Sequence, residues 1–142
     1  MSKTPIPNAL RLAVAERARR ACEYCRLPEG LGFTLLEVDH IIAEQHGGKT
    51  DAANLAYACV ICNRHKGPNL SSLDPHTGAH AWLYNPRTQD WNEHFQLNLD
   101  GTISGLTTEG RATAFLLAMN AFDRDQDRRA LIALNLLSLK KE

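Results

Sequence analysis

Two cysteine pairs with the same internal spacing are the feature that most constrains the fold of this chain. Cys22 and Cys25 form one C-x-x-C pair, Cys59 and Cys62 form the other, and the sequence contains no further cysteine. One tight turn presents two thiolates in each pair, and two pairs complete the tetrahedral shell that Zn²⁺ prefers. Because a shell of four thiolates has no open position, we expect a structural zinc ion that joins two distant segments. The alternative is a redox-active dithiol, for which one C-x-x-C pair would suffice.

The hydrophobic pattern predicts a mixture of helices and strands, an α+β class. Before and between the cysteines it favours a helix from about residue 10 to the first pair, a strand over residues 33–38 and an irregular loop over residues 44–54. Further along it favours a short helix within residues 58–66, a strand at 81–84, a β-hairpin around Asp100-Gly101, and two amphipathic helices at 108–121 and 123–139. Residues 123–129 mix acidic and basic side chains, and we expect them to be a solvated helix start with local ion pairs.

Length and composition are those of an ordinary globular domain. With 142 residues and 44% apolar side chains, we expect a single domain over residues 1–142. No apolar run approaches the roughly 20 residues of a membrane span, and the first residues lack the apolar stretch of a secretory signal. We therefore expect a cytoplasmic protein with no membrane partner.

Charge is sorted along the chain although the formal net charge is zero. Residues 1–26 carry six basic and two acidic side chains, whereas residues 27–62 carry one basic and five acidic side chains. Such sorting suits a site that must bind both a polyanion and a metal cation.

An ordered set of polar residues lies between and just after the cysteine pairs. Asp39-His40 interrupts the apolar run Val38–Ile42, Asn54 follows fourteen residues after His40, and Asn63 follows nine residues after Asn54. Taken alone, Asp39-His40 is better explained as a strand end with two satisfied polar groups than as a catalytic pair. The whole set, however, resembles the HNH endonuclease family over about residues 10–70. The matching motifs are Cys22-Glu23-Tyr24-Cys25, Asp39-His40-Ile41-Ile42, Gly47-Gly48, Asn54-Leu55 and Cys59-Val60-Ile61-Cys62-Asn63-Arg64-His65-Lys66-Gly67.

The resemblance implies a ββα-metal core over residues 10–70, stapled by the four-cysteine zinc site, with the hairpin and helices of residues 80–142 packed on it. Asn85-Pro86-Arg87, Trp91 and His94-Phe95 are also similar to a bacterial subgroup of the family. The implied activity is a metal-dependent endonuclease of bacterial or phage type that hydrolyses phosphodiester bonds in DNA, expected to be double-stranded. Its implied cofactors are a structural Zn²⁺ ion and a catalytic Mg²⁺ or Mn²⁺ ion.

Phosphodiester hydrolysis assigns a role to each residue of the set. His40 can accept a proton from water near neutral pH, and Asp39 offers a hard oxygen ligand to the catalytic metal. The resemblance implies that Asn63 adds a second oxygen ligand. It also implies that Asn54 is not a ligand but holds the loop and orients His40. Because neighbours on a regular strand face opposite sides, we expect a strand end or a strong twist at Asp39-His40.

Several further residues carry open alternatives. His65 is either a further ligand of the catalytic metal, a phosphate contact or a helix-surface residue. Arg20, Arg64 and Lys66 are expected to offset the charge of the zinc thiolates and to bind nucleic acid, unless they are merely solvated. The alternative function is a non-catalytic, zinc-stapled nucleic-acid-binding module, with a thiol redox protein as a third hypothesis. The sequence does not choose between a monomer and a dimer.

Overall fold

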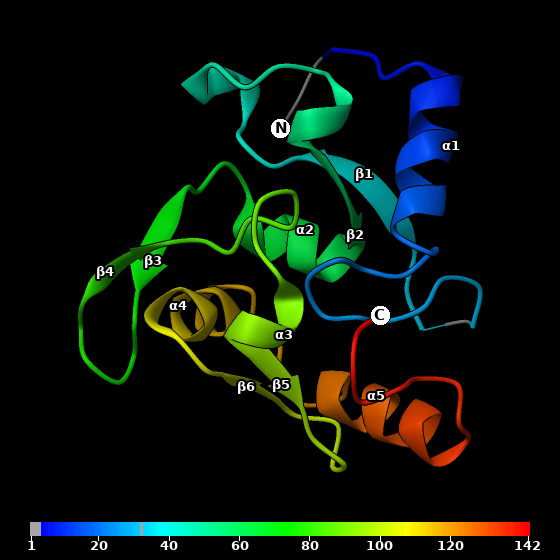
Figure 1. The fold of residues 1–142 in the computed structure, drawn as a ribbon, viewed down its shortest axis with the longest axis vertical. Helices are drawn as coiled ribbons and strands as arrows, with labels where there is room; N and C mark the ends of the chain where they lie inside the picture. Colours follow the sequence, from blue (N-terminus) through cyan, green and yellow to red (C-terminus); the bar gives the residue numbers. More distant parts are fainter. Residues whose placement is uncertain (1–3, 32) are drawn as a thin grey trace. The chain divides into compact units, whose positions relative to one another are not determined.

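The computed structural model describes residues 4–31 and 33–142, and the chain divides into two compact units, residues 1–69 and residues 70–142 (Figure 1). Within the described residues, the first unit combines helices with one two-stranded antiparallel sheet and the second unit combines helices with two, in keeping with the expected α+β class. No helix in the described part of the chain is long and apolar enough to cross a membrane. The first unit contains α1 (Asn8–Arg17), β1 (Leu36–His40), β2 (Leu55–Cys59) and α2 (Val60–Lys66), with 3-10 helices at Glu44–His46 and Ala52–Asn54. The second contains β3 (Ser71–Leu73), β4 (His80–Trp82), α3 (Trp91–His94), β5 (Phe95–Leu97), β6 (Ile103–Gly105), α4 (Thr108–Leu116) and α5 (Arg124–Ala133).

The first unit is built around the antiparallel pair of β1 and β2. Leu36 lies opposite Cys59, and His40 lies opposite Leu55. Both α1 and α2 pack against this pair, and every residue of β2 is buried. A strand covered on both faces has no alternation of polar and apolar residues, which is why the hydrophobic pattern did not predict β2.

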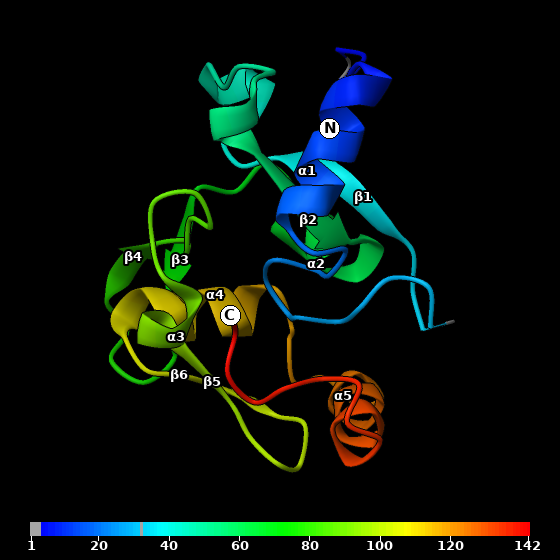
Figure 2. The same ribbon diagram turned by 45° about the vertical axis from the view of Figure 1, so that its right-hand side comes forward.

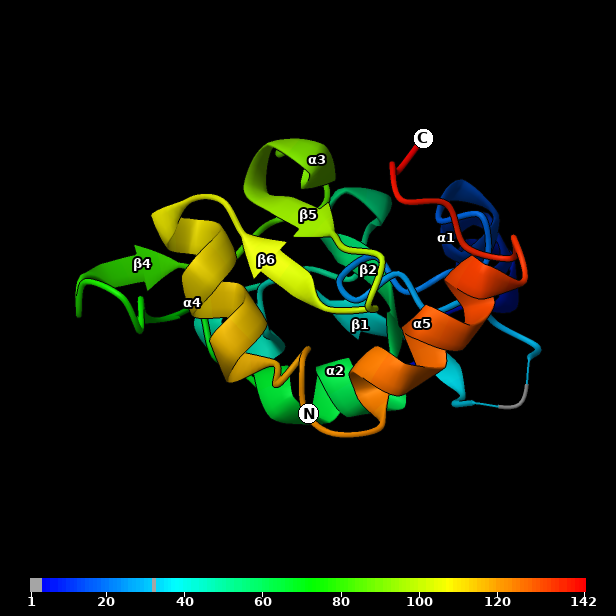
Figure 3. The ribbon, with the colours of Figure 1, turned by 90° about the horizontal axis from the view of Figure 1, so that it is seen from below.

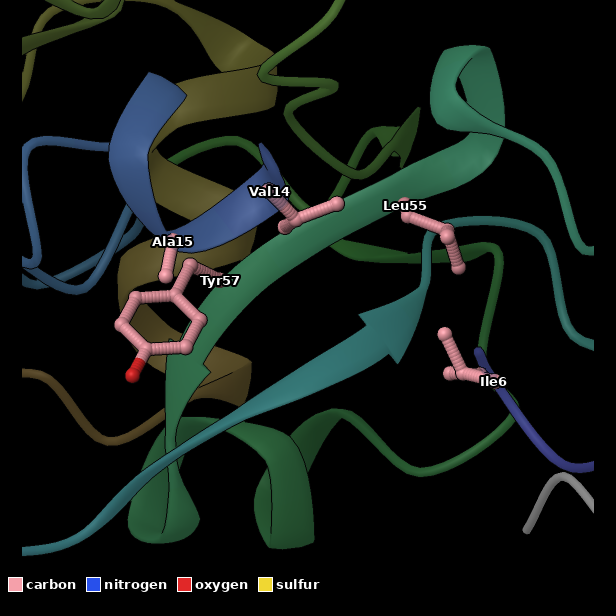
Figure 4. Close-up of a cluster of buried hydrophobic side chains, with 5 residues drawn as sticks. All are labelled: Ile6, Val14, Ala15, Leu55 and Tyr57. Carbon is pink, nitrogen blue, oxygen red and sulfur yellow. The ribbon is translucent and has the colours of Figure 1, made fainter. Parts of the chain in front are cut away.

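A small apolar cluster fixes α1 against β2 (Figure 4). Val14 and Ala15 of α1 pack with Leu55 and Tyr57 of β2, and Ile6 joins the cluster from the segment before the helix. Burial of each large side chain contributes about 1.5–3 kcal/mol. The cluster therefore occupies one face of the strand pair and leaves the opposite face to α2.

Several element boundaries differ from the sequence prediction. Helix α1 ends at Arg17 rather than at the first cysteine pair, because Arg19 and Arg20 have positive φ angles of 54° and 55°. Strand β1 begins three residues later than the predicted strand and continues to His40, where it ends. The predicted irregular loop over residues 44–54 contains two short 3-10 helices.

Helix α4 is the central element of the second unit. It packs against β6 and against the β3–β4 pair, as Figures 2 and 3 show. Strands β5 and β6 pair antiparallel on either side of residues 98–102, with Leu97 opposite Ile103. Trp91 and Phe95 are both 1% exposed, and their rings lie 5.2 Å apart.

The helix start expected to be solvated is instead anchored by buried arginines. Arg124 and Arg128 are 8% and 1% exposed, so the expectation was wrong for these two residues, whereas Asp123, Gln126 and Arg129 are exposed. Arg128 donates to the carbonyl oxygens of Gly101 and Met119 at 2.7 Å and 2.6 Å, and Arg124 donates to the carbonyl oxygen of Leu117. Their guanidinium groups satisfy backbone acceptors that have no helical partner, which the charge pattern does not reveal.

Candidate functional site

The four cysteines come together in the first unit. Their Sγ atoms all lie within 4.8 Å of one another, and the Sγ atoms of Cys25 and Cys59 are 3.7 Å apart. Four sulfur ligands at a Zn–S distance of about 2.3 Å lie about 3.8 Å apart in a tetrahedron. Within each pair, the backbone N–H of the second cysteine donates to the sulfur of the first, at 3.4 Å for Cys25 and 3.3 Å for Cys62. The arrangement fits a tetrahedral zinc ion.

Burial makes this cluster unfavourable without a cation. Burial raises the pKa of the Cys22 and Cys62 thiols well above the ordinary value, whereas the hydrogen bond with Cys22 lowers the pKa of Cys59. Four buried thiolates would repel one another, and a divalent ion with soft-ligand affinity would offset their charge. Because Cys59 ends β2 and Cys62 lies in α2, the ion would join the loop of Cys22 and Cys25 to both elements.

The register of β1 separates its polar residues between two faces. Residues directly opposite each other in a pair share a face, so Val38 and His40 lie on the face of Tyr57 and Leu55. Glu37 and Asp39 lie on the other face, toward α2, and both contact side chains of that helix. Asp39 and His40 therefore face opposite sides of the strand, and β1 ends at His40, as the sequence predicts.

The Asp39 carboxylate is paired with a buried lysine. Lys66, at 2% exposure, lies at the end of α2, and its Nζ atom is 3.0 Å from Oδ2 of Asp39 and 3.0 Å from the carbonyl oxygen of His40. Burial raises the pKa of Asp39 above its ordinary value, and the Lys66 charge opposes this shift.

The His40 imidazole is buried and held at one ring nitrogen. Its Nε2 atom lies 2.8 Å from the Thr50 hydroxyl oxygen and 3.6 Å from Oε1 of Glu44. Glu44 in turn accepts hydrogen bonds from the backbone N–H and the hydroxyl of Thr4. A proton on Nε2 would be donated to the Thr50 oxygen and would leave a lone pair on Nδ1.

Asn54 fastens the loop that follows β1. Its Oδ1 atom accepts from the backbone N–H of Ile42, and its Nδ2 atom donates to the carbonyl oxygens of Ile42 and Lys49, each at 2.9 Å. The Asn54 carbonyl oxygen also accepts from the N–H of Ile41 at 2.8 Å. The backbone directly after His40 is therefore fixed to the residue that precedes β2. Gly48 lies so close to Ile42 that a Cβ atom would come within 1.7 Å of its carbonyl oxygen.

Asp39, His40 and Asn63 line one pocket of about 490 Å³. Asn63 is oriented by a 2.6 Å hydrogen bond from its Nδ2 atom to Oε1 of Glu37, which also lines the pocket. Carboxylate and amide oxygens from these residues are the donors that Mg²⁺ and Mn²⁺ prefer, so the donor set fits a hard divalent cation.

The remaining predicted site residues differ in their positions relative to this pocket. His65 is exposed, its Nδ1 atom lies 2.9 Å from the Ile61 carbonyl oxygen, and it does not line the pocket. Two positions along a helix turn about 200°, so Asn63 and His65 face opposite sides of α2. Arg64 is exposed and lines the pocket, whereas Arg20 forms ion pairs with Glu16 and Glu29.

Three residues of this region were not predicted from the sequence. Glu37 was recognisable in principle, because it precedes Asp39 by two residues and so shares its strand face. Thr50 reaches His40, and Arg11 reaches the pocket wall, only through the folding of distant segments. No local pattern marks either residue.

A second pocket, of about 530 Å³, lies within residues 70–142 but does not hold a comparable set of groups. Its wall includes Ile103, Ala114, Phe115 and Arg111. The Arg111 guanidinium is already bound to the buried carboxylate of Asp74, with Nη2 2.8 Å from Oδ2. We therefore assign the candidate active site to the pocket of the first unit.

Comparison with known proteins supports the same segment. Residues 22–69 match the family model described as HNH endonuclease, which confirms the resemblance over this part of the chain. No curated protein and no solved structure gives a significant match. The matched segment begins at the first cysteine, includes the second pair, and contains Asp39, His40, Asn54 and Asn63.

Proposed function

We propose, from the match of residues 22–69 to the HNH endonucleases, that this protein is a metal-dependent endonuclease that hydrolyses phosphodiester bonds in DNA. The observation that carries the proposal is the shared pocket of Asp39, His40 and Asn63 within that segment. The order of β1, β2 and α2 along the chain supports a ββα-metal core. The cysteine cluster at the junction of β2 and α2 supports a structural zinc that stabilises this core without taking part in the reaction.

His40 is the proposed general base. In the tautomer that carries its proton on Nε2, beside the Thr50 hydroxyl, the Nδ1 lone pair would accept a proton from the attacking water. The anchored ring nitrogen fixes the orientation of the imidazole, and the Asn54 hydrogen bonds fix the backbone directly after it. Both sets of contacts lower the entropy cost of orienting the imidazole for proton transfer.

Asp39 and Asn63 are the proposed ligands of the catalytic Mg²⁺ or Mn²⁺ ion. When bound, such an ion polarises the scissile phosphate and stabilises charge on its oxygens. Glu37 acts on Asn63 as a positioning residue, because it accepts from the amide nitrogen and thereby directs the amide oxygen away from itself. His65 is not part of this proposal, since it lies on the opposite side of α2.

Two arginines provide the proposed contacts to DNA. Arg11 of α1 and Arg64 of α2 line the same pocket, and neither guanidinium forms an ion pair with a carboxylate in residues 4–31 and 33–142. Phosphates on both sides of the scissile bond would offset these charges. We propose double-stranded DNA as the substrate, since paired cationic groups from separate helices suit a backbone that carries phosphates on two strands.

The experiment is incubation of supercoiled plasmid with the zinc-loaded full chain and added Mg²⁺ or Mn²⁺, with EDTA in a parallel sample. Nicked or linear plasmid that forms only with added metal supports the endonuclease. A gel shift without nicking, under every metal condition, would instead favour the zinc-stapled binding module. Single-stranded DNA and RNA of matched length test the substrate class in the same assay.

A further inference from the structure

The proposed metal ligand Asp39 already has a cationic partner within the protein. The Lys66 ammonium is buried, and both of its hydrogen-bond acceptors belong to consecutive residues of β1, the Oδ2 atom of Asp39 and the carbonyl oxygen of His40, each at 3.0 Å. A buried ammonium group is stable only when it is paired, so this contact is strongly preferred over an unpaired one. Lys66 therefore binds Asp39 from inside the fold instead of presenting its charge at the surface.

The geometry of α2 brings this lysine to the proposed metal ligands. Lys66 follows Asn63 by three residues, so the two side chains lie on the same face of the helix, toward Glu37 and Asp39. A divalent ion bound to Asp39 and Asn63 would lie only a few ångströms from the Lys66 charge. In a partly buried site such like charges repel one another far more strongly than in water.

On the basis of the proposed function, we propose that Lys66 is a positioning residue that makes metal binding depend on substrate. It holds the Asp39 carboxylate in place in the absence of metal and weakens the affinity of the site for a divalent cation. The phosphates of bound DNA offset the combined positive charge of lysine and metal ion, and the site then binds the metal tightly. The substrate class is a phosphodiester polyanion, and the ligand is a hard divalent cation.

The test is a titration of the zinc-loaded full chain with Mn²⁺. The electron paramagnetic resonance signal of the free ion measures how much Mn²⁺ is bound. Lys66→Met should bind Mn²⁺ about tenfold or more tightly than the wild type without DNA, because a neighbouring positive charge has been removed. The matched control is Lys49→Met, which removes an equal charge from a loop position outside the pocket and should change the affinity less than about twofold. An equal or weaker Mn²⁺ affinity of folded Lys66→Met would overturn the proposal.

The dependence on substrate is tested in the His40→Ala background, where a short DNA duplex should stay intact. Adding the duplex should raise the Mn²⁺ affinity of the His40→Ala variant about tenfold or more. In the double variant that also carries Lys66→Met, the duplex should raise the Mn²⁺ affinity much less. Equal gains in the two variants would overturn the inference but leave the endonuclease proposal intact. If neither wild type nor Lys66→Met binds Mn²⁺, with or without DNA, the proposed metal site and this inference are both wrong.

A second measurement keeps Lys66 in place and therefore tests the proposal even if the Lys66→Met variant does not fold. The Nζ resonance of a buried, hydrogen-bonded ammonium can be followed by ¹⁵N NMR. Mg²⁺ is added to the His40→Ala variant after this variant has bound the uncleaved duplex. The addition should shift the Lys66 resonance and leave the Lys49 resonance unchanged. A Lys66 resonance that does not respond to Mg²⁺ under these conditions would contradict the proposal.

Discussion

Replacement of Gly48 by alanine tests how closely the backbone at Gly48 must approach Ile42 and Asn54. The added Cβ would lie 1.7 Å from the Ile42 carbonyl oxygen and 2.8 Å from Nδ2 of Asn54. Both neighbours are held, so the backbones must separate by about 1 Å or more before a methyl group fits. That movement stretches the 2.9 Å hydrogen bonds between Asn54 and Ile42 beyond useful range. Overpacking and lost hydrogen bonds together should lower the free energy of unfolding by about 3 kcal/mol.

Gly47→Ala is the matched control, because the adjacent glycine has a different requirement. Gly47 has a φ of +89°, but an added methyl group would meet nothing within 4 Å, so alanine there should cost only about 1–2 kcal/mol of backbone strain. Urea denaturation followed by circular dichroism gives both values at saturating zinc. Amide exchange adds a local measure, since the Ile42 N–H should lose protection in Gly48→Ala alone. Equal losses in the two variants, or a protected Ile42 amide in Gly48→Ala, would refute the close-approach argument.

Three further predictions concern the metal cluster and the buried charges. Cys59→Ser should release the zinc and unfold much of the first unit, since zinc binding contributes on the order of 10 kcal/mol to such sites; a folded, zinc-free variant in native mass spectrometry would contradict this. The hydrogen bond from Arg111 lowers the pKa of Asp74, so the stability that ionised Asp74 supplies is complete above about pH 4 and is lost as the pH falls from there through the lowered pKa. Acid titration of stability should therefore be flatter in Asp74→Asn, which should also be less stable at pH 7. Arg128→Leu should destabilise the protein by about 3 kcal/mol because two buried carbonyl oxygens lose a charged donor; exposed Arg129→Leu should change thermal stability by less than about 0.5 kcal/mol.

The parts of the site that depend on spacing could be predicted from the sequence. Two C-x-x-C pairs allow few arrangements, and the structure brings all four sulfur atoms together. Alternation along a strand predicted a strand end at Asp39-His40, and β1 does end at His40, although the two side chains still face opposite sides of the strand. Both inferences use geometry that is local to one turn or one strand.

The parts that depend on packing between elements could not be predicted. Lys66 was expected at the surface as a nucleic-acid contact, but the face of α2 that packs on β1 carries it to Asp39. The same limit applies to Arg124 and Arg128, whose charges suggested a solvated helix start. A sequence pattern reports the polarity of a side chain, whereas its partner is fixed only when separate elements meet.

The most direct test of the account is the rate at which His40→Ala nicks supercoiled plasmid at saturating Mg²⁺, relative to the wild type. If His40 takes the proton from the attacking water, its loss should lower the rate about 100-fold or more. The zinc content and Mn²⁺ affinity of the variant should stay at wild-type values, because the cysteines, Asp39 and Asn63 are untouched. A variant that cuts at the wild-type rate would contradict the assignment of this pocket as the active site.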